Sequence, residues 1–284
     1  MKRTGIFFHY QMGERLSDFP QLLGPTLNEP NVLLYDAFYP FKPRSEYDLD
    51  PVGEEQLLEV HSGAMVEQVK RSGYYQTAVL SAGGTVQAAQ RIWEGDIDNA
   101  FVFTGCGDHH AGRDSFGGWC YFNGAALAVT ELRRRYGASR FAIVDTDAHH
   151  GDGTWDIFKD DEDLLYVCFC GMGTVERNNK VNVHVPYYTS DADYLEKVEQ
   201  EFAPRARRFR PEAIFWNWGY DGTQGEYGDM GLTPDVHHQL ARTFKAVADE
   251  ACGGRLIVVL CGGSGKGTAN YAIPRIIRRL AELE

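Results

Sequence analysis

Short apolar runs alternate with longer amphipathic stretches along most of the chain. The apolar runs predict strands over residues 5–9, 32–35, 100–104, 141–144, 164–169, 213–216 and 256–260. The amphipathic stretches predict helices over residues 54–71, 85–93, 124–135, 191–209, 234–250 and 269–283. Strands that alternate with helices of about ten or more residues indicate parallel βαβ units. We therefore expect an α/β fold, a single domain over residues 1–284 with a central, mainly parallel sheet and helices on both faces. The proline-bearing segment 40–51 is expected to be a surface excursion rather than a domain boundary.

Polar residues that could take part in catalysis or ligand binding follow four of these predicted strands. Histidines follow 100–104, acids and histidines follow 141–144, an aspartate follows 213–216, and a glycine-rich segment follows 256–260. The carboxyl ends of parallel strands lie at one edge of a sheet, where open α/β sheets keep their sites. We expect these four loops to meet there.

The segment 145–154, with the sequence DTDAHHGDGT, contains a candidate metal-binding arm. Asp147 and His149 are two residues apart, so their side chains leave the same face of an extended backbone. Together with Asp221 they would form a three-ligand site that leaves one position for water or substrate. Zn²⁺ suits such ligands, and Fe²⁺ or Co²⁺ suits them nearly as well. The alternatives are that the acids of 145–154 cap a following helix and that Asp221 is an ordinary turn residue.

The adjacent His109 and His110 are candidates for proton transfer. At most one of them can point straight at a water in the metal site; that histidine would act as general base and return the proton to a leaving amine. The other would give electrostatic support or a hydrogen bond. Asp145 and Asp152 flank the candidate ligands and are the natural partners that would fix the histidine tautomers.

The segment 262–267, with the sequence GGSGKG, has two interpretations. Its backbone N–H groups could bind phosphate, but it is not a P-loop because Lys266 is followed by Gly267 instead of Ser or Thr. We favour the second interpretation, in which glycines such as Gly263 let the wall of an active site approach a substrate closely.

Composition narrows the class of partner. The net charge of −12 argues against nucleic acid as a partner and agrees with a cationic substrate. No apolar run approaches the roughly 20 residues that cross a bilayer, and the N-terminal apolar run is too short for a signal peptide, so no membrane association is expected. The six cysteines are scattered without a CxxC pair, which fits a reducing, cytoplasmic location. A homo-oligomer is left open.

Several of these segments resemble the histone deacetylase superfamily, which includes acetylpolyamine amidohydrolases and acetoin-utilisation-type proteins. Segment 145–154 matches the family signature Asp-x-Asp-x-His-His-Gly-Asn/Asp-Gly-Thr at every fixed position. Other similar stretches are 59–62, 83–84, 109–111, 118–123, 219–221 and 231–233. The resemblance covers roughly residues 55–284.

The resemblance implies an arginase-like fold with one catalytic zinc held by Asp147, His149 and Asp221. It also implies that His110 is the general base and acid, paired with Asp152, and that His109 is its companion, paired with Asp145. A structural K⁺ is implied near the backbone of Asp145, Asp147, His149 and Cys168. Trp119, after Gly118, falls where the family has a phenylalanine that lines the acyl-lysine tunnel.

The departures from the family pattern concern the substrate. The family has a tyrosine that hydrogen-bonds the substrate carbonyl, and alignment through 268–270 puts Lys266 at this position. Loss of one such donor costs about 100- to 1000-fold in rate. Lys266 could donate a charged hydrogen bond, although a nearby Zn²⁺ would oppose its protonation, or it could turn outward to an acidic substrate group. Tyr220 is a less favoured substitute.

Three further segments differ from the family. Residues 74–82 contain no acid to grip a peptide, residues 171–178 contain no aromatic to face Trp119, and the N-terminal segment lacks a His-Pro…Arg pattern. The sequence therefore predicts a zinc-dependent amide hydrolase acting on an acylated amine, a small metabolite rather than a histone, with Gly118, Trp119, Tyr220 and Gly263 contacting the substrate. The alternatives are a lyase or another hydrolase at the same site, and a weakly catalytic metal-binding or sensor protein.

Overall fold

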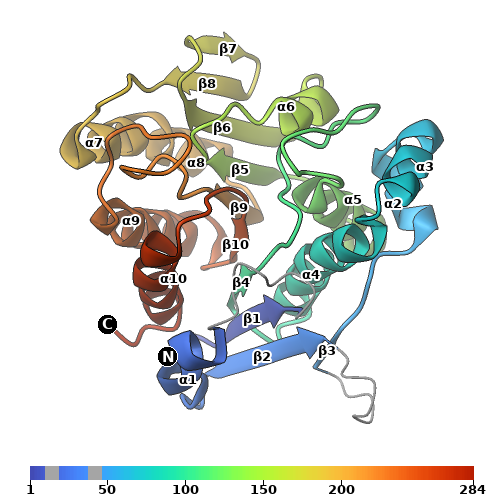
Figure 1. Ribbon diagram of the computed structural model, residues 1–284, viewed down its shortest axis with the longest axis horizontal. Coiled ribbons are helices and arrows are strands. Elements are labelled where there is room, and N and C mark those ends of the chain that lie inside the picture. The colour runs from blue at the N-terminus through green and yellow to red at the C-terminus, as the bar shows by residue number, and fades with distance from the viewer. Residues whose placement is uncertain (10–18, 38–46) are drawn as a thin grey trace.

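A central sheet with helices on both faces forms the core of the computed structural model, which describes residues 1–9, 19–37 and 47–284 (Figure 1). The strands follow the order β3-β2-β1-β4-β10-β9-β5-β6-β8-β7. Every neighbouring pair is parallel except β7 and β8, which are antiparallel. The bounds are β1 Thr4–Phe8, β2 Val32–Ala37, β3 Asp48–Leu49, β4 Asn99–Val102, β5 Phe141–Asp145, β6 Leu164–Cys170, β7 Val175–Arg177, β8 Lys180–His184, β9 Ala213–Trp218 and β10 Leu256–Leu260. The predicted α/β class and mainly parallel sheet are confirmed.

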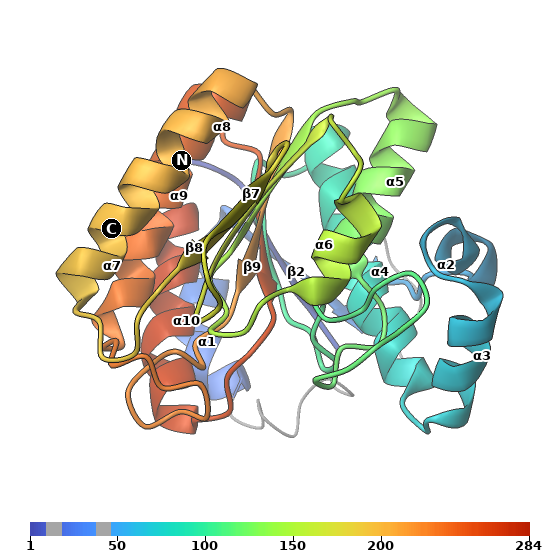
Figure 2. The ribbon, with the colours of Figure 1, turned by 90° about the horizontal axis from the view of Figure 1, so that it is seen from above.

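Two helical layers cover the sheet, as the view from above shows (Figure 2). One layer contains α1 Phe19–Leu27, α7 Asp191–Glu201, α8 Ala203–Phe209, α9 Asp235–Cys252 and α10 Lys266–Leu280. The other contains α4 Tyr75–Trp93, α5 Gly124–Tyr136 and α6 Asp152–Phe158, with α2 Glu54–Val60 and α3 Gly63–Arg71 outside them. No helix of the described ranges has both the length and the apolar character needed to cross a bilayer.

Burial on both faces explains why the central strands were visible in the sequence. Strands β5, β6, β9 and β10 are buried along their whole length. A parallel strand covered by helices on both sides is a near-continuous apolar run. Such runs were predicted to within one or two residues.

Two long predicted helices are each divided in two. The prediction over 54–71 is interrupted at His61, whose buried ring lies 2.7 Å from the carbonyl oxygen of Gly112 through Nδ1 and accepts the N–H of Asn123 through Nε2. Ser62 then caps α3 by accepting the N–H of Met65. The prediction over 191–209 is interrupted at Phe202, which ends α7 and precedes α8.

Other elements were missed or misplaced. Helix α4 begins at Tyr75, ten residues before its predicted start. Its first half contains small buried residues, which gave no amphipathic pattern in the sequence. The packing is close there, since a Cβ on Gly83 would lie 2.0 Å from the carbonyl oxygen of Asp50. Strand β8 was missed because polar Lys180 and Asn182 interrupt its apolar pattern, although both are buried. Helices α1 and α6 and strands β3 and β7 were not predicted.

The predicted surface excursion 40–51 is wrong at its end. Asp48 and Leu49 form β3 beside β2 and are buried. Residues 40–46 of that segment lie outside the described residues, as do residues 10–18 of the N-terminal segment.

Candidate active site

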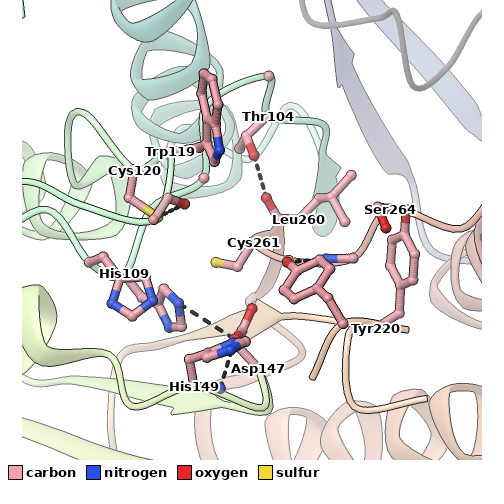
Figure 3. Close-up of a pocket in the computed structure, with 17 residues that line it drawn as sticks. Thr104, His109, Trp119, Cys120, Asp147, His149, Tyr220, Leu260, Cys261 and Ser264 are labelled. Atoms are coloured by element: carbon pink, nitrogen blue, oxygen red, sulfur yellow. Dashed lines mark hydrogen bonds and ion pairs between the residues drawn. The ribbon is translucent and has the colours of Figure 1, made fainter. Parts of the chain in front are cut away.

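The four loops that carry the polar residues converge as expected. They follow β4, β10, β9 and β5, which are direct neighbours in the sheet. Between them is a cavity of about 380 Å³ (Figure 3). Its lining residues are Thr104, Gly105, Gly107, His109, His110, Gly118, Trp119, Cys120, Asp147, His149, Tyr220, Tyr227, Leu260, Cys261, Gly262, Gly263 and Ser264.

Asp147 and His149 line this cavity, and with the buried Asp221 they form a compact group. Their candidate ligand atoms all lie within 4.8 Å of one another. His149 Nδ1 lies 3.1 Å from Asp147 Oδ1 and 2.7 Å from Asp221 Oδ2. Both carboxylates are buried, whereas the imidazole is partly exposed towards the cavity. The structure thus brings together the three residues that the sequence indicated.

The surroundings of this group fit a divalent cation. Asp221 Oδ1 accepts the N–H of Ala148, which directs Oδ2 towards His149 and Asp147. Asp221 Oδ2 is buried and makes no hydrogen bond of good geometry. Buried carboxylates are stable in proteins when they are paired or coordinate a metal. Two carboxylates and an imidazole are ligands that Zn²⁺ and Fe²⁺ accept.

The pKa shifts of these three residues also indicate a site that favours a cation. Burial, with the nearby charge of Asp147, raises the pKa of Asp221 to about 6. The adjacent carboxylates of Asp147 and Asp221 raise the pKa of His149 to about 10. Burial opposes ionisation of Asp147, but the positive charge of His109 and hydrogen bonds from His149 hold its pKa below the usual range. The site therefore concentrates negative charge and draws protons or cations to it.

The two histidines have different environments. His109 is buried, and its Nδ1 lies 2.9 Å from Asp145 Oδ2. Burial lowers its pKa, but the charges of Asp145 and Asp147 outweigh burial and raise it to about 10. Asp145 is itself held by the hydroxyl of Tyr166 at 2.8 Å. Without a bound cation, these carboxylates therefore favour the protonated form of His109.

His110 is the more accessible of the pair. Its Nδ1 lies 2.6 Å from Asp152 Oδ1. Burial and the positive charge of His109 lower its pKa, against the opposing effect of Asp152. Its ring centroid is 6.2 Å from that of His149. A neutral imidazole in this position can accept a proton from a water near His149.

Two glycines permit the close packing of this site. A Cβ on Gly118, whose φ is +55°, would lie 2.5 Å from His110 Cδ2. A Cβ on Gly262 would lie 2.1 Å from Asp147 Oδ2. A larger residue at position 118 would displace the general-base candidate, and one at position 262 would displace a ligand candidate. Close packing at Gly262 explains a glycine in segment 262–267 better than phosphate binding does.

The remaining predicted residues lie at different distances from the cavity. Trp119 is 59% exposed at the rim, with its ring edge-on to Tyr74. The Tyr220 ring is buried beneath Gly263 and against Trp218. Lys266 is the exposed first residue of α10 and is not among the residues that line the cavity.

Two residues of the site, Tyr227 and Glu226, were not predicted from the sequence. Tyr227 lines the cavity, and its ring stacks on His149 with centroids 5.7 Å apart. The carboxylate of Glu226 accepts the backbone N–H groups of Ser264 and Gly265. Both residues lie a few positions after Asp221, but no local spacing indicates that this loop turns back to the metal-binding residues.

A second group of potential ligands lies on the sheet beside the first. His150, Cys168 and Cys170 offer an imidazole and two thiols within 4.8 Å, and Asn182 contacts both His150 and Cys170. A hydrogen bond from Cys168 and the positive charge of His150 lower the pKa of Cys170 to about 5 although burial opposes this.

Comparison with known proteins agrees with this architecture. A model of the histone deacetylase domain matches residues 35–280. A probable deacetylase of Archaeoglobus fulgidus is 32% identical over 258 residues, which are 80% of this chain and 71% of the relative. A histone deacetylase-like amidohydrolase of Pseudomonas aeruginosa is 28% identical over 262 residues, 81% of this chain and 69% of the relative. The crystal structure of the HDA15 HD domain superposes with a TM-score of 0.82 at 23% identity, covering 98% of this chain and 89% of the other.

The fold and the site define an α/β protein with a candidate metal centre flanked by two carboxylate-paired histidines. The chain belongs to the histone deacetylase family. The resemblance noted in the sequence is confirmed, and with it a place among deacetylases and amidohydrolases.

Proposed function

We propose that this protein is a metal-dependent amide hydrolase that removes an acyl group from an acylated amine. The observation that supports it most is the contrast between two adjacent histidines beside one group of ligands. His110 has a lowered pKa and a carboxylate partner, whereas His109 has a raised pKa and a buried one. A site with a neutral base and a separate fixed positive charge suits attack of water on a carbonyl.

The roles follow from these positions. His110 accepts the proton of the attacking water and donates it to the leaving amine, while Asp152 holds its tautomer. His109, fixed by Asp145, keeps a positive charge beside the negative charge that develops during attack. Asp147, His149 and Asp221 would hold the cation, which when bound polarises the carbonyl and lowers the pKa of water.

Zinc is the proposed cation, with Fe²⁺ and Co²⁺ as alternatives that the same ligands accept. The K⁺ implied near the backbone of Asp145, Asp147, His149 and Cys168 stays a prediction. Both can be tested by elemental analysis of protein purified without added metal.

The rim supports a small acylated amine rather than a histone as substrate. Asp147 is the sole acid among the described residues that line the cavity, and it lies at the base. Tyr74, at the start of the 74–82 segment without acids, contacts Trp119 at the rim. This leaves an aromatic rim for an apolar acyl or alkyl group, with Gly118, Trp119, Tyr220 and Gly263 as proposed contacts. A protein substrate would need partners for its backbone amides there.

The test is hydrolysis of a panel of acyl-lysine peptides and acylated polyamines by protein with measured metal content. We expect turnover of at least one small amide, with a loss of about 100-fold or more for His110→Ala. No turnover by protein with full metal occupancy would contradict the proposal. Metabolite changes without amide hydrolysis would favour a lyase, and tight ligand binding without any turnover would favour a sensor.

A further inference from the structure

The cavity brings a phenol to the metal-binding residues from an unexpected loop. Tyr227 lies in the loop after β9, six residues beyond Asp221. Its ring stacks on His149 with an interplanar angle of 26°. Its hydroxyl lies 3.1 Å from the point that a Cβ on Gly262 would occupy, and Asp147 Oδ2 lies 2.1 Å from the same point. The hydroxyl and the Asp147 carboxylate therefore adjoin the same side of Gly262.

Two other hydroxyls of the cavity lining donate to protein groups, and a third belongs to a buried ring. The Thr104 hydroxyl donates to the carbonyl of Leu260, and the Ser264 hydroxyl donates to Glu226. The Tyr220 ring is buried between Gly263 and Trp218. Among the described lining residues with a hydroxyl, Tyr227 is the one whose ring stacks on a ligand candidate.

The Tyr227 hydroxyl is held in place as an acceptor. It accepts the backbone N–H of Gly263 at 2.9 Å. A phenolic hydroxyl can act as both an acceptor and a donor. Polarisation along a chain of hydrogen bonds strengthens the next donor in that chain.

Two anchors fix the backbone on either side of Tyr227. The Glu226 carboxylate accepts the N–H groups of Ser264 and Gly265, each at 3.0 Å. On the other side, the N–H of Gly228 donates to the carbonyl of Asp221 at 3.1 Å. The loop after β9 is thus bound to the glycine loop after β10 and to a candidate ligand.

We propose that Tyr227 donates the hydrogen bond that stabilises the substrate carbonyl oxygen as it becomes an oxyanion, and that Glu226 is its positioning residue. This inference rests on the proposed hydrolase function. A donor fixed before the reaction stabilises developing charge at little reorganisation cost. It explains how the site can keep an oxyanion donor when the position that the resemblance gives to tyrosine is Lys266.

The first experiment compares Tyr227→Phe with wild-type protein on the best substrate of the panel. We expect kcat/KM to fall about 100- to 1000-fold, mainly in kcat, with unchanged metal content and melting temperature. Tyr188→Phe removes a hydroxyl from an 89% exposed ring and is the matched control, expected to stay within about twofold. A full fall for Tyr220→Phe with none for Tyr227→Phe would overturn the assignment.

The second experiment measures affinity rather than activity. A trifluoromethyl ketone analogue of the substrate hydrates to a tetrahedral form whose oxygen would occupy the oxyanion position. We expect calorimetry to show binding about 10- to 100-fold weaker for Tyr227→Phe, since a charge-assisted hydrogen bond contributes about 1.5–3 kcal/mol. Equal affinity of both proteins for this analogue would overturn the inference.

Glu226 is tested by rescue. Glu226→Ala removes both acceptor oxygens, and we expect kcat to fall with little change in KM. Glu226→Gln keeps one amide oxygen as acceptor and should recover part of kcat. If His110→Ala abolishes activity while both Tyr227→Phe and Glu226→Ala retain it, the hydrolase function stands and this inference fails. If wild-type protein with full metal occupancy turns over nothing on the panel, the hydrolase function fails and this inference fails with it.

Discussion

His110 Nδ1 and Asp152 Oδ1 are 2.6 Å apart, and the Asp152 side chain is 70% exposed although His110 is mostly covered. The carboxylate raises the pKa of His110 against the stronger effects of burial and His109. We predict that Asp152→Asn shifts the acidic limb of the kcat/KM–pH profile to lower pH, because the neutral amide favours protonated His110 less. The rate on the plateau should fall about 10- to 100-fold, since the tautomer is less firmly held. An unmoved acidic limb would show that another group controls it.

Removal of the cation should destabilise the protein most at neutral pH. Burial and Asp147 raise the pKa of Asp221 to about 6 without a cation. This folded pKa exceeds the unfolded value, so ionisation of Asp221 costs stability as pH rises from about 4 through 6. A bound cation reverses this cost because it replaces the proton.

We therefore predict that Zn²⁺ raises the melting temperature more at pH 7.5 than at pH 5. The stabilisation should approach about 3 kcal/mol when free metal is about 100-fold above its dissociation constant. Scanning calorimetry after chelation and after metal return measures it. His149→Ala should lose the response; a variant that keeps the full response would place the cation elsewhere.

Acid should destabilise the fold through buried His237. Its Nδ1 accepts the indole N–H of Trp218 at 3.1 Å, and its Nε2 lies 2.8 Å from the Thr223 hydroxyl. Burial lowers its pKa to about 3. Between pH 3 and 6.5 the unfolded chain therefore binds a proton that the folded protein does not.

This contribution is complete above about pH 6.5 and is lost as pH falls towards 3, at about 1.4 kcal/mol per pH unit. We predict that His237→Gln flattens the slope of unfolding free energy between pH 5 and pH 7, whatever its effect on absolute stability. Urea unfolding at several pH values is the measurement, with exposed His184→Gln as the control. An identical slope in His237→Gln would assign the acid sensitivity to other groups, such as buried His61, whose pKa burial lowers to about 4.

Lys266 should matter less to the rate than Tyr227. It begins α10 outside the cavity lining, whereas Tyr227 contacts His149. We expect Lys266→Met to change kcat/KM by less than about tenfold, because loss of a true oxyanion donor costs about 100-fold or more. Steady-state kinetics on the same substrate decides this. A fall equal to that of Tyr227→Phe would return the donor role to Lys266.

The parts of the site that the sequence revealed are those encoded by local spacing. Asp147 and His149 are two residues apart at the end of a buried strand, so their common direction follows from strand geometry. Asp221 could be added because parallel strands end at one edge. The family resemblance and the α/β fold inferred from these patterns are both confirmed.

The missed parts depend on contacts between distant segments. His61 interrupts an amphipathic helical pattern because its ring contacts Gly112 and Asn123, which are 51 and 62 residues further along the chain. Strand β8 was not predicted because it contains Lys180, a polar residue that is buried only because its ammonium group donates to the carbonyl of Leu164. Tyr227 lies at the cavity because the neighbouring Glu226 accepts the backbone N–H of Gly265, in the loop after β10. None of these contacts leaves a periodic pattern in the sequence.

The order of the strands also determines when the site can exist. Strand β9 lies between β5 and β10, although the chain completes β6, β7, β8 and three helices between β5 and β9. Asp221 thus lies beside Asp147 and His149 only when β9 is paired with β5. The metal-binding group is complete only when this non-consecutive pairing has formed, so cation binding reports that β5 and β9 are paired.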